Sequence, residues 1–173
     1  MNKEELKQRL LDFDERVSLE EQCNPTVKYK CFLVGGSAFI LLNLIPRATY
    51  DIDVLRCTSR KLLNYMQEYG MNTNVSAYIG CFADGFVERA IKLELNTHTV
   101  DFYTLSLEDL VVSKIASGRI KDMKDIQSRI VLNNIDWEKL DELIDLTSEG
   151  MISDFSRREL IDLYEEYRRE FKK

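Results

Sequence analysis

A strand, a double glycine, an apolar helix and a second strand are predicted in close succession between residues 29 and 55. Tyr29–Val34 is rich in aromatic and β-branched residues, which is typical of a buried strand, and it runs directly into Gly35-Gly36. A glycine pair allows a tight turn and close backbone approach, so the chain is expected to leave the sheet here. Residues 37–45 then read as a short apolar helix, and Tyr50–Leu55 alternates with the period of a strand.

Helical patterns surround these strands, which favours an α/β (α+β) fold with a small mixed sheet, flanking helices and a helical C-terminal part. From the capping pattern that begins at Ser106, the chain is helical to its end. We therefore expect an α/β core with an N-terminal helix over residues 1–117 and a helical extension over residues 118–173, packed on the same core. The other expected elements are a helix over residues 2–22 ended by Asn24-Pro25, a helix from Thr58 or Ser59 to Tyr69, and strands at Ala90–Leu95 and Thr99–Thr104.

Charge and cysteine content narrow the class of protein. The net charge of −6 disfavours a general polyanion binder, although residues 112–130 carry five basic against two acidic side chains. The N-terminus is charged, and the longest nearly apolar run, residues 38–45, is far too short for a membrane span. The four cysteines form no CxxC pair, and we interpret them as reduced thiols. These features predict a cytoplasmic protein with no membrane segment.

Asp51 and Asp53 carry the predicted chemistry. Alternate strand residues point to the same side, so the two carboxylates converge, and they repel each other unless a cation lies between them. Mg²⁺ suits such oxygen ligands because it keeps positions open for phosphate oxygens. The helix start after Gly35-Gly36 offers free N–H groups to an anion, and Ser37 adds a hydroxyl. A phosphate cradle beside a metal-binding Asp pair is what phosphoryl or nucleotidyl transfer requires.

At this point the chain resembles the DNA polymerase β-like nucleotidyltransferase superfamily, whose signature is a Gly-Gly or Gly-Ser turn followed by Asp-x-Asp. The stretch Arg47–Asp53 reads Arg-x-Thr-x-Asp-Ile-Asp and is similar to the form found in AbiEii-type toxins and related uncharacterised bacterial nucleotidyltransferases. Residues 105–126 are similar to the second block of that group, and the region from Met71 to Ala90 matches poorly.

The resemblance implies two Mg²⁺ ions held by three carboxylates, the third on a later strand. Asp101 has the apolar-Asp-apolar setting that this role needs and is favoured as the third catalytic and metal-binding residue, while Glu94 is the alternative. The resemblance also places Arg47 and Thr49 with Gly35, Gly36 and Ser37 at the nucleotide.

Lys114 lies near the edge of the helix that follows the capping pattern, where a lysine can contact a triphosphate as a point charge. We assign it a catalytic role, and Arg119 and Asp122 are added to the nucleotide-binding group. The alternative is structural: Asp122 caps its helix, and Asp125 pairs with Lys121 or Arg129.

The expected reaction moves a nucleoside monophosphate from a nucleoside triphosphate to an acceptor. The resemblance implies tRNA or a protein as the acceptor, in a toxin that a cognate antitoxin silences. Two alternatives remain open from the residues. One is a small-molecule enzyme of the aminoglycoside-modifying type, which the acidic net charge favours. The other is a non-catalytic relative that binds a nucleotide or a partner.

Overall fold

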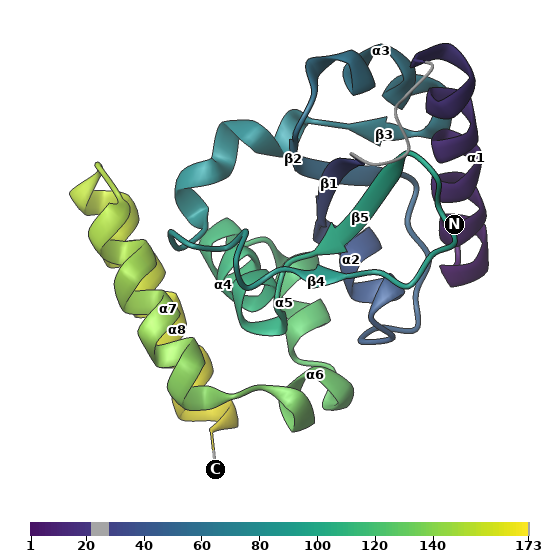
Figure 1. Ribbon diagram of the computed structural model, residues 1–173. Helices are drawn as coiled ribbons and strands as arrows, with labels where there is room; N and C mark the ends of the chain where they lie inside the picture. Colours follow the sequence, from purple (N-terminus) through teal and green to yellow (C-terminus); the bar gives the residue numbers. More distant parts are fainter. Residues whose placement is uncertain (22–27, 173) are drawn as a thin grey trace. The chain divides into compact units, whose positions relative to one another are not determined.

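The computed structural model describes residues 1–21 and 28–172, and the predicted helix stop at Asn24-Pro25 lies outside them (Figure 1). The chain divides into two compact units. Unit 1 comprises residues 1–77 and 90–105, and unit 2 comprises residues 78–89 and 106–173. The boundary that we expected after residue 117 therefore lies within unit 2.

A mixed five-stranded sheet forms the centre of unit 1, as expected for an α+β fold (Figure 1). The strand order is β3-β2-β1-β5-β4. The central strand β1 is antiparallel to β2 and parallel to β5, while β2 is parallel to β3 and β4 is antiparallel to β5. The bounds are β1 Tyr29–Val34, β2 Ile52–Cys57, β3 Met71–Asn72, β4 Ile91–Lys92 and β5 Val100–Thr104.

Helix α1 (Lys3–Glu21) covers one face of this sheet and confirms the predicted opening helix. Its apolar side chains are spaced by three or four residues, and Phe13 packs edge-on against Phe102 of β5, with ring centroids 6.2 Å apart. The carboxylate of Asp14, 2% exposed, accepts hydrogen bonds from the backbone N–H groups of His98, Thr99 and Val100 at 2.6–2.8 Å. One buried side chain of α1 therefore fixes the start of β5.

Helix α2 (Gly35–Leu41) differs from the predicted helix over residues 37–45 at both ends. It begins at the first glycine, and it stops because Asn43 adopts a positive φ of 60°, which reverses the chain. The helix after β2 matches the prediction: Ser59 caps η1 (Arg60–Leu62), and α3 (Leu63–Met66) and η2 (Gln67–Tyr69) follow. The predicted strand at Ala90–Leu95 is reduced to the two residues of β4.

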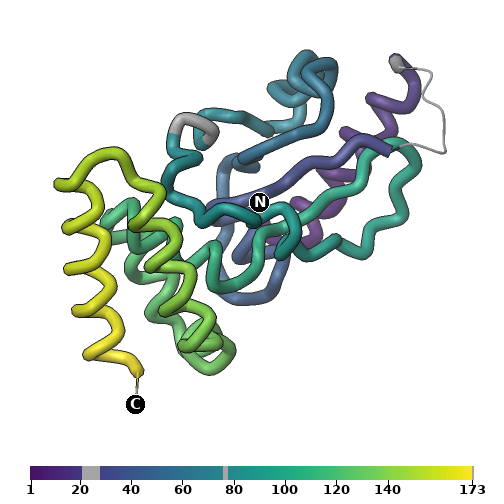
Figure 2. Tube along the Cα trace, turned by 60° about the vertical axis from the view of Figure 1, so that its left-hand side comes forward, coloured from purple at the N-terminus to yellow at the C-terminus, as the bar shows by residue number. Residues whose placement is uncertain are grey.

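Unit 2 is helical. Ser106 caps α4 by accepting from the Asp109 backbone N–H at 3.2 Å, as predicted. Arg89 attaches residues 78–89 to α4 through an ion pair with the buried Asp109 carboxylate at 2.7 Å. Helices α7 and α8 lie side by side and antiparallel, in both views (Figure 2). The bounds are α4 Leu107–Ser117, α5 Ile120–Ile126, α6 Arg129–Asn134, α7 Trp137–Gly150 and α8 Asp154–Phe171; η3 (Asn74–Cys81) spans the boundary between the units.

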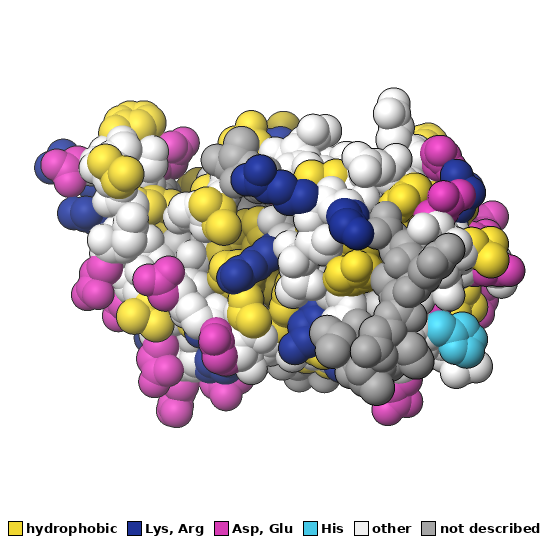
Figure 3. Space-filling view, turned by 45° about the horizontal axis from the view of Figure 1, so that its top comes forward, with side chains coloured by type: hydrophobic (Ala, Val, Ile, Leu, Met, Phe, Trp, Pro, Cys, Tyr) yellow, Lys and Arg dark blue, Asp and Glu magenta, His cyan; other side chains and the backbone are white. Residues whose placement is uncertain are grey.

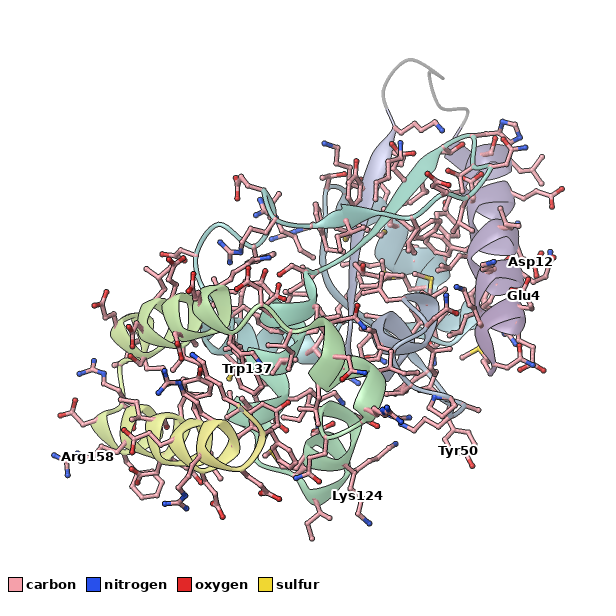
Figure 4. The ribbon with its side chains drawn as sticks, turned by 90° about the horizontal axis from the view of Figure 1, so that it is seen from below. Glu4, Asp12, Tyr50, Lys124, Trp137 and Arg158 are labelled. Atoms are coloured by element: carbon pink, nitrogen blue, oxygen red, sulfur yellow. The ribbon has the colours of Figure 1, made fainter. Side chains whose placement is uncertain are left out.

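Trp137 lies among the helices of unit 2, in contact with Tyr167 of α8 at a ring-centroid distance of 5.7 Å (Figure 4). Trp137 is therefore a packing residue between α7 and α8. In the described part of the chain, no helix combines the length and the apolar character needed to cross a bilayer.

Candidate functional site

The turn after β1 lies directly against the Asp-x-Asp strand. Gly35 has a φ of +63°, and a β-carbon built on it would overlap the Asp53 carboxylate and lie 3.3 Å from its Cγ. The β1–β2 register pairs Val34 with Asp53, which explains this proximity. Two predicted site residues are therefore neighbours in space, and only a residue without a side chain fits between β1 and the carboxylate.

The guanidinium of Arg47 lies beside Gly36, the second glycine of the turn. A β-carbon on Gly36 would be 2.9 Å from Nη2 of Arg47 and 3.4 Å from its Cζ. The Arg47 guanidinium also donates to the Ala48 carbonyl at 3.1 Å. Ser37 is buried, and its hydroxyl donates to the Val34 carbonyl at 3.0 Å, so in this structure it stabilises the first turn of α2.

Asp51 precedes β2 and is exposed, whereas Asp53 is half-buried. The hydroxyl of Thr49 lies 3.4 Å from Oδ1 of Asp51 and 3.3 Å from its carbonyl, so Thr49 orients the exposed acid. Between them, Tyr50 is 98% exposed and points away from unit 1 (Figure 4). Asn72 of β3 donates to Oδ1 of Asp53 at 3.2 Å.

Sequence reasoning missed Asn72. It lies in the segment without a recognisable pattern, and it reaches Asp53 because β3 pairs with β2 in parallel, Asn72 opposite Asp53. A two-residue strand carries no periodic signal, so no local pattern identifies this contact.

Asp101 lies away from the Asp pair along the sheet. Asp101 is opposite Lys30 and Asp53 is opposite Val34, so their places along β1 differ by four residues, about 13 Å at 3.3 Å per residue. The Asp101 carboxylate pairs with Lys92 at 2.8 Å and Lys28 at 3.5 Å. Glu94, its alternative, is exposed just after β4. Across the described residues, no three His, Cys, Asp or Glu side chains gather closely enough to hold a metal ion.

Lys114, Arg119 and Asp122 form a cluster within unit 2. Lys114 is 6% exposed, and its ammonium donates to the carboxylates of Asp122 and Asp125, the latter at 3.1 Å. Arg119 donates to Oδ2 of Asp122 at 2.7 Å, and Ser117 donates to the same oxygen at 2.6 Å. Lys114 of α4 is thus a partner of Asp125, because the turn at Gly118 brings α5 back beside α4.

The pKa of Asp122 reflects this cluster. Burial alone would raise it, but hydrogen bonds from Lys114 and Ser117 and the charges of Lys114 and Arg119 outweigh burial and lower the pKa below its usual value. Asp122 is therefore held as a carboxylate, and its charge is balanced by Lys114. In this structure both side chains bind each other, and their contribution to a nucleotide site stays a prediction.

The donor set of unit 1 suits one hard divalent cation. Mg²⁺ is usually bound by one or two carboxylates and takes its other oxygens from phosphates and water, which Asp51 and Asp53 would allow. Arg47 supplies a planar cation for phosphate oxygens at the adjoining turn. This arrangement supports binding of a Mg²⁺–polyphosphate at the Gly35-Gly36 turn.

A family model described as "Nucleotidyltransferase of unknown function (DUF6036)" matches residues 8–172. No curated protein and no solved structure gives a significant match. The matched range includes both predicted blocks, from the Gly-Gly turn to the cluster around Lys114.

Proposed function

Because the chain belongs to this family of nucleotidyltransferases of unknown function, we propose that it transfers a nucleoside monophosphate from a nucleoside triphosphate to an acceptor, with Mg²⁺ bound by Asp51 and Asp53. The observation that carries the proposal is the contact of Asp53 with Gly35, together with Arg47 over Gly36. Asp53, the Gly35-Gly36 turn and Arg47 therefore lie next to one another in unit 1.

The residues have separate tasks. Asp51 and Asp53 hold the metal ion, which supplies charge stabilisation to the phosphates when it is bound. Gly35 and Gly36 let the triphosphate approach the backbone, and Arg47 binds its oxygens. Thr49 and Asn72 orient the two acids. An acceptor oxygen attacks the α-phosphorus, the bond to the β-phosphate oxygen breaks, pyrophosphate leaves with the electron pair, and the acceptor proton passes to water.

In the direct test, α-³²P nucleoside triphosphates are incubated with the protein, Mg²⁺ and either total tRNA or cell protein. The radioactivity incorporated into the tRNA or the protein is then measured. Transfer should occur for the wild type and fall by about 100- to 1,000-fold in Asp53→Asn and Asp51→Asn, a loss typical of removing an essential electrostatic group. Asp12→Asn is the matched control, because among the described residues this acid of α1 has one side-chain partner, Gln8. Unchanged transfer in both site variants would refute the proposal.

A second candidate is nucleotide binding without transfer. The observation that favours it is the place of Asp101, which is paired with lysines about 13 Å along the sheet from Asp53. Isothermal titration with each triphosphate, with and without Mg²⁺, separates the candidates when it accompanies the labelling. Binding that requires Asp53, with no labelled product from either acceptor pool, would support this second function.

We also propose that the protein is a toxin silenced by a cognate antitoxin. This proposal rests on the similarity of Arg47–Asp53 to the Arg-x-Thr-x-Asp-Ile-Asp stretch of AbiEii-type toxins. Induced expression of the wild type in a bacterial host should arrest growth, and Asp53→Asn should not. Equal growth of both strains, at equal protein levels, would remove the toxin and its antitoxin from the proposal.

A further inference from the structure

The sheet face that carries Asp53 also carries a row of basic side chains. Lys30, Phe32 and Val34 alternate along β1 and share one face, and their cross-strand partners share it with them. Lys30 is opposite Asp101, Phe32 lies between Tyr103 and Arg56, and Val34 is opposite Asp53. Lys92 of β4 is opposite Tyr103. We call Lys28, Lys30, Arg56, Lys92 and Tyr103 the basic strip.

Side-chain contacts support this common face. Nζ of Lys30 lies 5.8 Å from the Tyr103 ring centroid, within the range of a cation–π contact. The Tyr103 ring stacks on Phe32 with centroids 5.1 Å apart and 24° between the planes. Lys28 and Lys92 both reach Asp101. A half-exposed aromatic ring is therefore supported by a buried one and surrounded by cations.

The charges of the strip are only partly balanced. Of the four cations of the strip, Lys28 and Lys92 pair with Asp101, and this one carboxylate against four cations leaves an excess of three positive charges within the strip. Within the part of the chain that the structure describes, the side chains of Lys30 and Arg56 form no hydrogen bond or ion pair, and both are exposed. In a protein with a net charge of −6, this excess is a local feature. Lys and Arg side chains interspersed with apolar ones are visible on the face shown in Figure 3.

The strip lies in line with the proposed reaction centre. Asp53 pairs with Val34 of β1, and Arg56 pairs with Phe32. Measured along β1 from Val34, the position of Arg56 is therefore two residues away and Lys30 is four residues away, which corresponds to about 7 and 13 Å. A chain of phosphates that lies along β1 would therefore lead to Asp53. Tyr103 offers a ring for base stacking, which cations alone do not provide.

We propose that the basic strip binds single-stranded RNA and directs its end toward Asp53, so that the acceptor of the transfer is RNA. The acceptor role of the RNA rests on the proposed function, whereas the binding of RNA to the basic strip does not. Charge complementarity identifies a polyanion, and the half-exposed Tyr103 beside Lys30 favours one with stackable bases. A cationic aminoglycoside acceptor is disfavoured by the same charges.

The test is fluorescence anisotropy of a labelled single-stranded 12-mer RNA with the full chain, measured without triphosphate. All variants carry Asp53→Asn, so that no transfer occurs. The strip variant combines Lys30→Gln, Arg56→Gln and Lys92→Gln. The matched control combines Lys121→Gln, Lys124→Gln and Arg129→Gln, which removes the same charge from the other basic segment. Thermal unfolding of each variant confirms that it folds.

Three phosphate contacts predict that Kd rises about 20-fold between about 50 and 200 mM salt, and the strip variant should lose most of this dependence. The control variant should bind as the parent protein does. Tyr103→Leu should weaken binding by about 5- to 150-fold, while Tyr103→Phe retains the ring and the affinity. Absence of RNA binding, or equal Kd values for strip variant and parent, would overturn the inference.

Labelling is then repeated with the same strip and control substitutions in the protein that keeps Asp53, and this separates the two proposals. RNA binding that depends on the strip, in a protein that transfers no nucleotide, would refute the proposed function and leave the RNA surface. Transfer to RNA that is unaffected by the strip substitutions would refute the surface alone. If the substitutions instead reduce only the labelling of a protein, the strip binds an acidic polypeptide and the RNA proposal is wrong.

Discussion

The Asp53 carboxylate lies against the backbone of Gly35, at a distance that leaves no room for a β-carbon on position 35. The positive φ of Gly35 adds a second reason for glycine at this position. Two requirements, one of space and one of backbone conformation, coincide at the residue that joins β1 to α2. They make the position a direct probe of the proposed site.

Gly35→Ala should displace the Asp53 carboxylate and abolish the rise in thermal midpoint that Mg²⁺ and triphosphate give the wild type. The strained backbone alone should cost about 1–2 kcal/mol. Gly70→Ala is the control, because Gly70 has a φ of +67° but its nearest neighbour, the Tyr50 carbonyl oxygen, is 4.0 Å from a built β-carbon. A ligand-induced midpoint shift retained in Gly35→Ala would contradict the site.

Arg47→Ala should weaken triphosphate binding by about 10- to 100-fold, as expected for the loss of a hydrogen-bonded charge on phosphate. Arg47→Lys should recover only part of the affinity, because an ammonium lacks the planar fork of donors. Isothermal titration gives both values, with the exposed Arg60→Ala as a control in the same unit. Equal affinities for all four proteins would show that Arg47 has no part in binding.

Asp14→Ala should be among the most destabilising changes in unit 1. It leaves two buried backbone N–H groups, of Thr99 and Val100, and the partly buried one of His98 without their acceptor, and each unsatisfied group costs about 1 kcal/mol or more. We expect a loss of more than about 3 kcal/mol in urea unfolding, and less than about 0.5 kcal/mol for Asp12→Ala, an acid on the polar side of α1 (Figure 4). Similar losses would mean that other contacts fix β5.

The stabilisation from Asp122 should depend on pH. Its pKa is lowered in the folded protein, so its charged form stabilises the fold above the unfolded pKa of about 3.9, and this contribution disappears as pH falls through the folded value. Removing one partner of a buried pair costs about 3–5 kcal/mol. Asp122→Asn should therefore lose stability by about that amount at roughly pH 6, and the difference should shrink towards pH 2–3. A pH-independent difference would exclude the ionised cluster.

Elements with a local signal could be predicted from the sequence. The periodic apolar residues of α1, the strand at Tyr29–Val34 and the cap at Ser106 were all confirmed, because each depends on neighbours within a few residues. The family and the α+β class follow from the same local features. The helix predicted over residues 37–45 exists as α2, but its predicted end was wrong because Asn43 adopts a positive φ, which composition does not reveal.

Contacts between distant segments could not be predicted. The place of Asp101 depends on the register of β5 against β1, and no pattern within Thr99–Thr104 encodes that register. Lys114 was expected at a helix edge, yet it is buried because the chain turns at Gly118 and brings two acids of α5 against it. In both cases the residue type suggested chemistry, and the tertiary partner determines what the side chain contacts.

The order of strands around β1 has a consequence for how the protein assembles. β2 follows β1 closely in the chain, whereas Asp101 is separated from its β1 partner Lys30 by about seventy residues, and such distant pairings form late because a long loop must close first. During synthesis, the turn and its acids are therefore complete in the emerging chain before Lys92 and Tyr103 join the sheet. The proposed nucleotide site would exist first, and the proposed surface for its acceptor would be added last.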